Sequence, residues 1–111
     1  MYSASIEVVE SSKDRLVLSV SGRLIIADAA TKEVSSEGQV VAHFGSIKSV
    51  VITQLLSKGE IVWWALNLSM RDGSEIFVGR TPNDVEASVA AARLGTVLGV
   101  EVLAPTGENG A

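Results

Sequence analysis

The sequence contains no cysteine. Disulfide bonds, thiolate catalysis and zinc sites with thiolate ligands are therefore excluded. Histidine occurs once, as His43 beside Phe44, and a lone histidine at a strand end is usually structural. The spacing supplies no converging partners for a metal ion. We therefore expect no metal, no cofactor and no enzymatic activity, and an enzyme with His43 as its base is only a residual alternative.

Phosphate-binding loops are also missing. The glycines occur singly, and neither G-x-G-x-x-G nor G-x-x-x-x-G-K-[ST] is present, so nucleotide binding has no support. Three close acidic pairs have ordinary explanations as surface or helix-start charge, and a general acid–base pair would also need a pocket. These pairs are Glu7 with Glu10, Glu33 with Glu37, and Asp84 with Glu86.

Clusters of positive charge and long apolar runs are absent. The nine Lys and Arg residues are dispersed and the formal net charge is -4, which argues against a nucleic-acid or anionic membrane partner. Charged residues interrupt every window before it reaches the roughly 20 apolar residues of a membrane span. The first ten residues, MYSASIEVVE, lack the features of a signal peptide. We therefore expect a soluble, cytoplasmic protein.

The hydrophobic content is 47% over 111 residues, enough for one folded core. We expect a single domain over residues 1–103. Residues 104–111 have no apolar periodicity and are expected to form a flexible polar tail.

Alternation identifies the best-defined strand. Every second residue from Val62 to Met70 is apolar, which places these side chains on one face of a strand. Arg71-Asp72-Gly73 then predicts a turn that closes on Gly73 in the left-handed region. In that register Leu68 opposes Ile76 and Leu66 opposes Val78. A plain two-residue turn would instead oppose Leu68 with Phe77, and we prefer the first register because it gathers four aliphatic side chains on one face.

A helix follows. Thr81 is expected to be the N-cap with Pro82 at the first helical position, and Gly99 is expected to be a left-handed C-cap. At helical spacing one stripe faces the core: Ala87, Ala90, Ala91, Leu94, Val97 and Leu98. The opposite side carries a stripe without charge: Val85, Val89, Ala92 and Thr96.

The remaining strands are short. We expect them near residues 4–9, 16–20, 24–27, 39–42 and 47–56, with a loop or weak helical turn over 29–38. The total is about seven strands, divided four and three by a break at Phe44-Gly45, and one terminal helix. The fold class is α+β, mainly β. Strands this short hide their edges in a curled barrel or in two crossed sheets, and the helix caps one end.

Three stretches together resemble a bacterial pleckstrin-homology-like (PH-like) domain over about three quarters of the chain. They are FGSIKSVVI, WWALNLSMRDGSEIFVG and DVEASVAAARLGTVLGVEV; the N-terminal third matches only in strand number. The resemblance implies a seven-stranded, partly open antiparallel barrel of two near-orthogonal sheets, closed by the C-terminal helix. It implies binding of lipid, peptide or protein, or self-assembly. Phosphoinositide-binding members carry several basic residues around the first loop, whereas this loop has Lys13 and Arg15 with Glu10 and Asp14 beside them.

Two apolar surfaces suggest an interface. Trp63 is expected to point away from the Trp64 face, together with Ala65 and Phe77. One alternative is that the N-terminal strands or residues 29–38 cover Trp63. The other is that Trp63 is exposed as a binding hot spot. The stripe of Val85, Val89 and Ala92 is either ordinary exposed surface or a helix–helix seam.

We predict a non-enzymatic protein-interaction or assembly domain that forms a homo-oligomer. Its predicted interface residues are Trp63, Phe77, Val85, Val89 and Ala92. The alternative is a module for a small ligand or lipid headgroup at the open end of the barrel. Its predicted binding residues are Lys13, Arg15 and Arg23.

Overall fold

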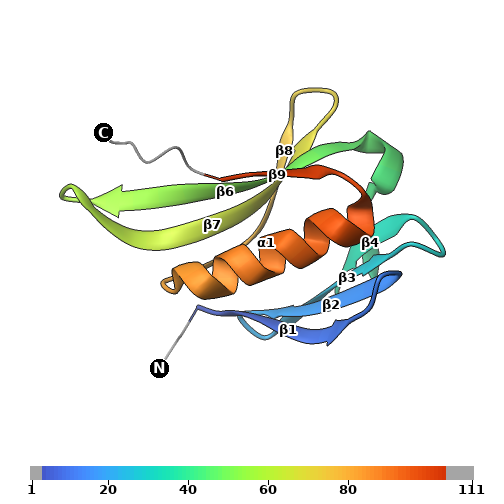
Figure 1. Cartoon of the computed structure of the whole chain (residues 1–111), viewed down its shortest axis with the longest axis horizontal. Coiled ribbons are helices and arrows are strands. Elements are labelled where there is room, and N and C mark those ends of the chain that lie inside the picture. The colour runs from blue at the N-terminus through green and yellow to red at the C-terminus, as the bar shows by residue number, and fades with distance from the viewer. Residues whose placement is uncertain (1–3, 105–111) are drawn as a thin grey trace.

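The computed structural model describes residues 4–104, which form two antiparallel-rich sheets and one long helix (Figure 1). The first sheet has the order β1-β2-β3-β4-β5. Its strands are β1 (Ile6–Ser11), β2 (Arg15–Val20), β3 (Arg23–Asp28), β4 (Glu33–Ser36) and β5 (Gln39–His43). A 3-10 turn, η1 (Phe44–Ser46), leads to the second sheet, of order β8-β7-β6-β9. It consists of β6 (Ile47–Ser57), β7 (Glu60–Met70), β8 (Glu75–Thr81) and β9 (Glu101–Leu103).

The α+β, mainly β class is confirmed, and the chain passes from one sheet to the other at the expected break. The strand number is different, because residues 4–104 form nine strands and not seven. The two additional strands are β4 and β9. β9 runs parallel to β6, with Val50 opposite Val102. Of the tail expected over 104–111, all but Ala104 lies outside the described residues.

The expectation of a loop over residues 29–38 is wrong, because this stretch contains β4. Val34 is buried and lies opposite Ala27 on β3 and Ala42 on β5. The turn after β4 has positive φ at Glu37 and Gly38, as in the two-residue turns that suit hairpins. Val34 is thus the buried apolar residue of an interior strand that has almost no apolar alternation.

The β7–β8 hairpin follows the predicted register only near its turn. Gly73 has a φ of 94° and Leu68 lies opposite Ile76, as expected. The pairing of Leu66 with Val78 is wrong, because the register shifts between Leu66 and Asn67 and places Gly79 opposite Leu66. Beyond the shift β8 stays paired with β7, with Ala65 opposite Arg80 and Trp64 opposite Thr81.

β8 also connects the two sheets. A Cβ atom added at Gly79 would overlap Val20 Cγ1 of β2. One residue earlier, the carbonyl oxygen of Val78 accepts a hydrogen bond from Arg23 Nη2 at 3.2 Å. Glycine at position 79 therefore permits the close backbone approach that joins the sheets.

Helix α1 (Asp84–Leu98) begins two residues later than expected. The N-cap is Asn83 and not Thr81: Asn83 Oδ1 accepts hydrogen bonds from the N–H groups of Val85 and Glu86 at 2.9 and 3.1 Å. Thr81 instead belongs to β8, where it is fully buried, and Pro82 precedes the helix. The helix ends as predicted, with Gly99 at a φ of 72° and its N–H donating to Gly95 O at 2.8 Å.

α1 packs between the two sheets and contacts β1, β2 and β3 on one side and β6, β7, β8 and β9 on the other (Figure 1). All six residues of the predicted core-facing stripe are buried. On β7 the predicted alternation holds for Leu66, Leu68 and Met70, whereas Trp64 is half-buried and Val62 is exposed. The small alanines early in α1 allow the helix to lie close to both sheets.

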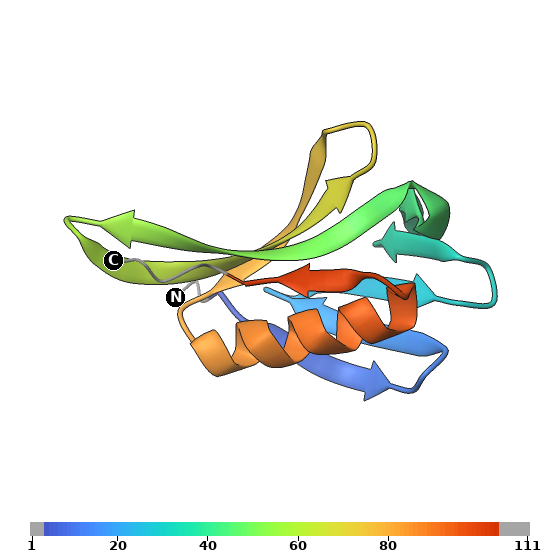
Figure 2. The ribbon, with the colours of Figure 1, turned by 45° about the horizontal axis from the view of Figure 1, so that its top comes forward.

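The outer halves of β6 and β7 project beyond the body as a two-stranded hairpin (Figure 2). β8 pairs with β7 only as far as Trp64, and β9 pairs with β6 only from Ser49 to Val51. We call residues 55–63 the arm. Within residues 4–104, no helix is long and apolar enough to cross a lipid bilayer.

Candidate functional site

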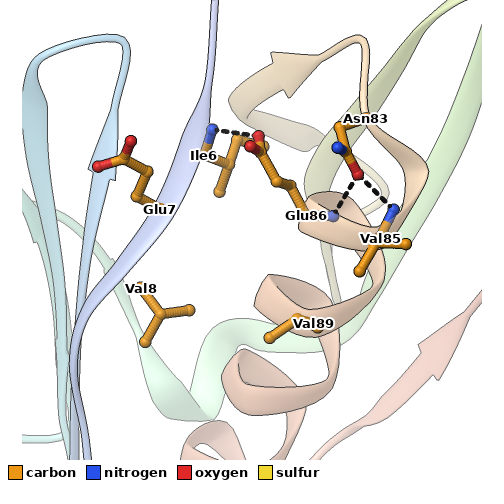
Figure 3. A pocket seen from close by; sticks show the side chains of 7 residues that line it. All are labelled: Ile6, Glu7, Val8, Asn83, Val85, Glu86 and Val89. Atoms are coloured by element: carbon orange, nitrogen blue, oxygen red, sulfur yellow. Dashed lines mark hydrogen bonds between the residues drawn. The ribbon is translucent and has the colours of Figure 1, made fainter.

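An apolar groove with a volume of about 360 Å³ lies between β1 and the first two turns of α1 (Figure 3). We call it the β1–α1 groove. β1 forms one wall and α1 with its N-cap forms the other. The lining residues are Ile6, Glu7, Val8, Asn83, Val85, Glu86 and Val89.

The strand wall is an open sheet edge. β1 is the outermost strand of the first sheet, and Ser21 N donates to Ser5 O at 3.0 Å. Because backbone groups in an antiparallel pair alternate in direction, those of Ile6 and Val8 point away from β2. The Ile6 N–H accordingly donates across the groove to Glu86 Oε1 at 3.2 Å. Near Val8 the groove is therefore bordered by main chain directed outward.

The walls are aliphatic and accessible. Val8 on β1 and Val89 on α1 lie across the groove from one another (Figure 3). Their exposed fractions are 36% and 41%, and that of Val85, one turn earlier on α1, is 64%. Aliphatic side chains that line a concave surface at this exposure are suited to burial against a partner.

A hydrogen-bonded cluster holds one end of the groove in place. Glu86 Oε1 accepts a hydrogen bond from the buried Thr81 hydroxyl at 2.6 Å, in addition to the one from Ile6 N. The Thr81 hydroxyl accepts in turn from Asn83 N at 3.2 Å. One carboxylate thus ties the edge strand, the end of β8 and the start of the helix together.

Charge in the groove has one sign. Glu7 and Glu86 are the charged residues among those that line it, and Asp84 stands in the same helical turn as Glu86. A partner with an apolar surface and a positive charge at its edge therefore complements this groove.

The structure brings together only some of the predicted interface residues. Val85 and Val89 line the groove, and Ala92 is exposed further along α1. Phe77 is 55% exposed and lies at a smaller cavity of about 90 Å³ between β8 and strands β3, β4 and β5. The groove wall formed by β1 was not predicted. The aliphatic residues of the first strand were its only signal in the sequence.

Trp63 lies in the arm, apart from the groove. It is half-exposed, and the guanidinium group of Arg80 covers one face of its ring at 4.4 Å from the centroid. Such a cation–π contact contributes about 0.5–1 kcal/mol at an exposed site. Ala65 lies on the same side of β7 as Trp63 but is only 3% exposed, so the face that the two residues share is covered at Ala65.

The three basic residues predicted for a ligand site do not share one pocket. Lys13 and Arg15 lie at the β1–β2 turn, whereas Arg23 lies at the far end of the β2–β3 pair. Arg15 Nη1 is 3.0 Å from Glu10 Oε1, and Arg23 donates to Val78 O. Lys13 instead borders a polar cavity of about 350 Å³ whose lining includes Arg93 of α1. Arg93 could not be predicted beside Lys13, because the two residues are 80 positions apart in the sequence.

His43 is exposed, and its Nδ1 is 3.9 Å from Glu33 Oε2. In the part of the chain that the structure describes, no three histidine or acidic side chains gather as metal ligands. Comparison of the chain with protein-family models, with curated proteins and with solved structures finds no match. The geometry of the groove itself, with apolar walls, an open strand edge and acidic charge, suits a protein segment as ligand.

Proposed function

We propose that this chain is a cytoplasmic, non-enzymatic protein-interaction domain that self-associates through the β1–α1 groove and the outer face of α1. One observation carries the proposal: exposed aliphatic side chains of α1 and β1 surround an open strand edge. Association would remove this apolar surface from water, and each Å² of apolar surface buried contributes about 25 cal/mol of favourable free energy.

The fold supports the same proposal. A C-terminal helix packed against two sheets, after hairpins that follow one another in sequence, is compatible with a PH-like domain built as a partly open barrel of near-orthogonal sheets. β4 and β9 are departures from the seven-stranded pattern. Such domains act through binding or assembly, which agrees with the apolar groove.

Replacing Val89 by glutamate is expected to raise the dissociation constant for self-association at least tenfold. The substitution places a third carboxylate beside Glu7 and Glu86 and removes an aliphatic wall, and a tenfold change corresponds to about 1.4 kcal/mol. Sedimentation equilibrium over a range of protein concentrations measures the effect. Val40→Glu is the matched control, because Val40 on β5 is 48% exposed and lies outside the groove. A monomeric wild-type protein at the highest concentration would contradict the proposal.

A second candidate function is recognition of an anionic group at the polar cavity beside Lys13. Arg93 Nη1 donates to Ser11 Oγ at 3.0 Å, and Ser12 and Thr96 complete the lining. Two cations and nearby hydroxyls are suitable partners for a phosphate. This observation favours the ligand-binding alternative at one of its three predicted residues.

If this candidate is correct, the protein will float with vesicles that contain anionic lipids and will be released as salt is raised from about 0.05 to 0.5 M. Arg93→Gln is expected to reduce the bound fraction at least threefold. Arg80→Gln is the matched control, because Arg80 lies over Trp63 and not at the cavity. Equal flotation with neutral vesicles would exclude the candidate, and inorganic phosphate as a competitor distinguishes a free anion from a lipid headgroup.

A further inference from the structure

The arm is apolar on both of its faces. Its apolar pairs are Leu55 with Trp63, and Leu56 with Ile61, and the polar pair Ser57 with Glu60 lies at its tip. The exposed fractions are 61% for Leu56, 44% for Ile61 and 39% for Val62. A solvated two-stranded ribbon normally alternates apolar with polar residues, so that at most one face needs cover.

A ribbon of this kind has little stability of its own in water. Among residues 4–104, no third strand pairs with the arm. Long, exposed apolar edges are also the sites at which sheets recruit further chains. The composition of the arm is therefore explained if another protein surface covers it.

The charged tip of the arm favours a protein partner over a lipid bilayer. Ser57, Lys58, Gly59 and Glu60 form the tip, and burial of their charges in hydrocarbon would be costly. Insertion into a lipid bilayer from the tip is therefore unfavourable. A protein groove that accepts the aliphatic pair and leaves the tip at a polar rim has no such cost.

The β1–α1 groove has the complementary features. Its aliphatic walls match the Leu56–Ile61 pair. The tip carries both Lys58 and Glu60, so the contact requires Lys58 to face the carboxylates of the groove and Glu60 to point to solvent. Both elements also present backbone edges, since β1 is an edge strand and neither β8 nor β9 reaches the arm.

We propose that the arm of a second copy of this chain fills the β1–α1 groove. The inference rests on the proposed self-association and names the surface that the groove receives. The arm and the starts of β1 and α1 lie toward the same end of the molecule (Figure 1). Two copies therefore exchange arms about a two-fold axis and use the same contact twice, which closes the assembly as a dimer.

Cysteine cross-linking tests the contact directly, because the chain has no cysteine of its own. Two single variants, Leu56→Cys and Val89→Cys, are prepared, one with a larger affinity tag, and are mixed in equal amounts under mild oxidation. A disulfide needs Cβ atoms about 3.5–4.5 Å apart. We expect the mixed disulfide to form at least tenfold faster than either variant with itself. Val40→Cys mixed with Val89→Cys is the matched control and is expected to remain uncross-linked.

The possible outcomes distinguish the arm exchange from self-association in general. If the wild-type protein is a monomer in sedimentation, both are overturned. If it is a dimer and Val89→Cys links to itself but not to Leu56→Cys, the helices meet at a seam and only the arm exchange is overturned. A dimer without either cross-link overturns the arm exchange too.

A second readout uses charge. Lys58→Glu reverses the positive charge at the tip and is expected to raise the dimer dissociation constant about tenfold. Lys48→Glu is the control, because it makes the same change at an exposed position outside the arm. Equal effects of the two variants would show that net charge alone acts, and would overturn the assigned contact.

Discussion

Replacing Gly79 by alanine is expected to lower the free energy of unfolding by about 2–3 kcal/mol. The added methyl group would overlap Val20 Cγ1. Val20 is 1% exposed and β-branched, so its side chain has little freedom to rotate away. The strain falls where β8 and β2 hold the two sheets together. Urea denaturation followed by circular dichroism measures the loss.

Two further variants make the result specific. Gly45→Ala is expected to change stability by less than about 0.5 kcal/mol, because a methyl group there meets no atom within 4 Å. In the double variant Gly79→Ala/Val20→Ala the overlap is removed, so the two substitutions are expected to cost less together than the sum of their separate effects. An unchanged midpoint for Gly79→Ala alone would mean that β8 and β2 are further apart than described.

Replacing Glu86 by alanine is expected to cost about 2 kcal/mol of stability and to weaken self-association in the same variant. The substitution removes the acceptor of two hydrogen bonds, from the buried Thr81 hydroxyl and from Ile6 N. A buried hydroxyl whose proton has no acceptor costs roughly 1–3 kcal/mol, even though the Thr81 oxygen still accepts from Asn83 N. Because Ile6 then loses its tie to the helix, the strand wall of the groove is no longer fixed. Urea denaturation and sedimentation equilibrium measure the two effects.

Neighbouring substitutions separate this effect from general helix electrostatics. Asp84→Ala removes a carboxylate from the same helical turn and is expected to cost about 0.5 kcal/mol through the helix dipole alone. Glu86→Gln keeps the side-chain oxygen as an acceptor and is expected to retain more than half of the stability lost in Glu86→Ala. If Asp84→Ala and Glu86→Ala lower stability and self-association equally, the hydrogen-bonded cluster around Glu86 does not hold the groove in place.

The sequence predicted best those elements whose signals are local. Gly99 could be identified as a C-cap because glycine adopts the left-handed conformation without steric cost, and its φ is 72°. The core-facing stripe of α1 followed from helical spacing, and Gly73 from turn chemistry. In each case the physical cause lies within a few residues of the feature.

Features that depend on distant contacts could not be predicted. Threonine is a common N-cap residue. The hydroxyl of Thr81, however, donates its hydrogen bond to Glu86, and Asn83 caps the helix instead. β4 forms because two neighbouring strands cover Val34. β9 has only three residues and is positioned by β6 and by the close approach of Val102 to Gly95.

The candidate site shows the same division. The exposed face of α1 could be identified from helical spacing at Val85 and Val89. Its other wall could not, because nothing in the sequence places Val8 beside a helix 80 residues away. The arm was not predicted, although its residue Trp63 was, because the unpaired state of the arm follows from where β8 and β9 end.

The order of strands in the two sheets has a kinetic consequence. Among residues 4–104, every strand pairing except β6 with β9 joins strands that are adjacent along the chain, so the hairpins close short loops with little loss of entropy. The pairing of β6 with β9 can form only after α1 has packed against the sheets, because α1 precedes β9 in the chain and positions it beside β6. We therefore expect two hairpin arrays to form early, and amide hydrogens of β9 to acquire protection against exchange in the last step of folding.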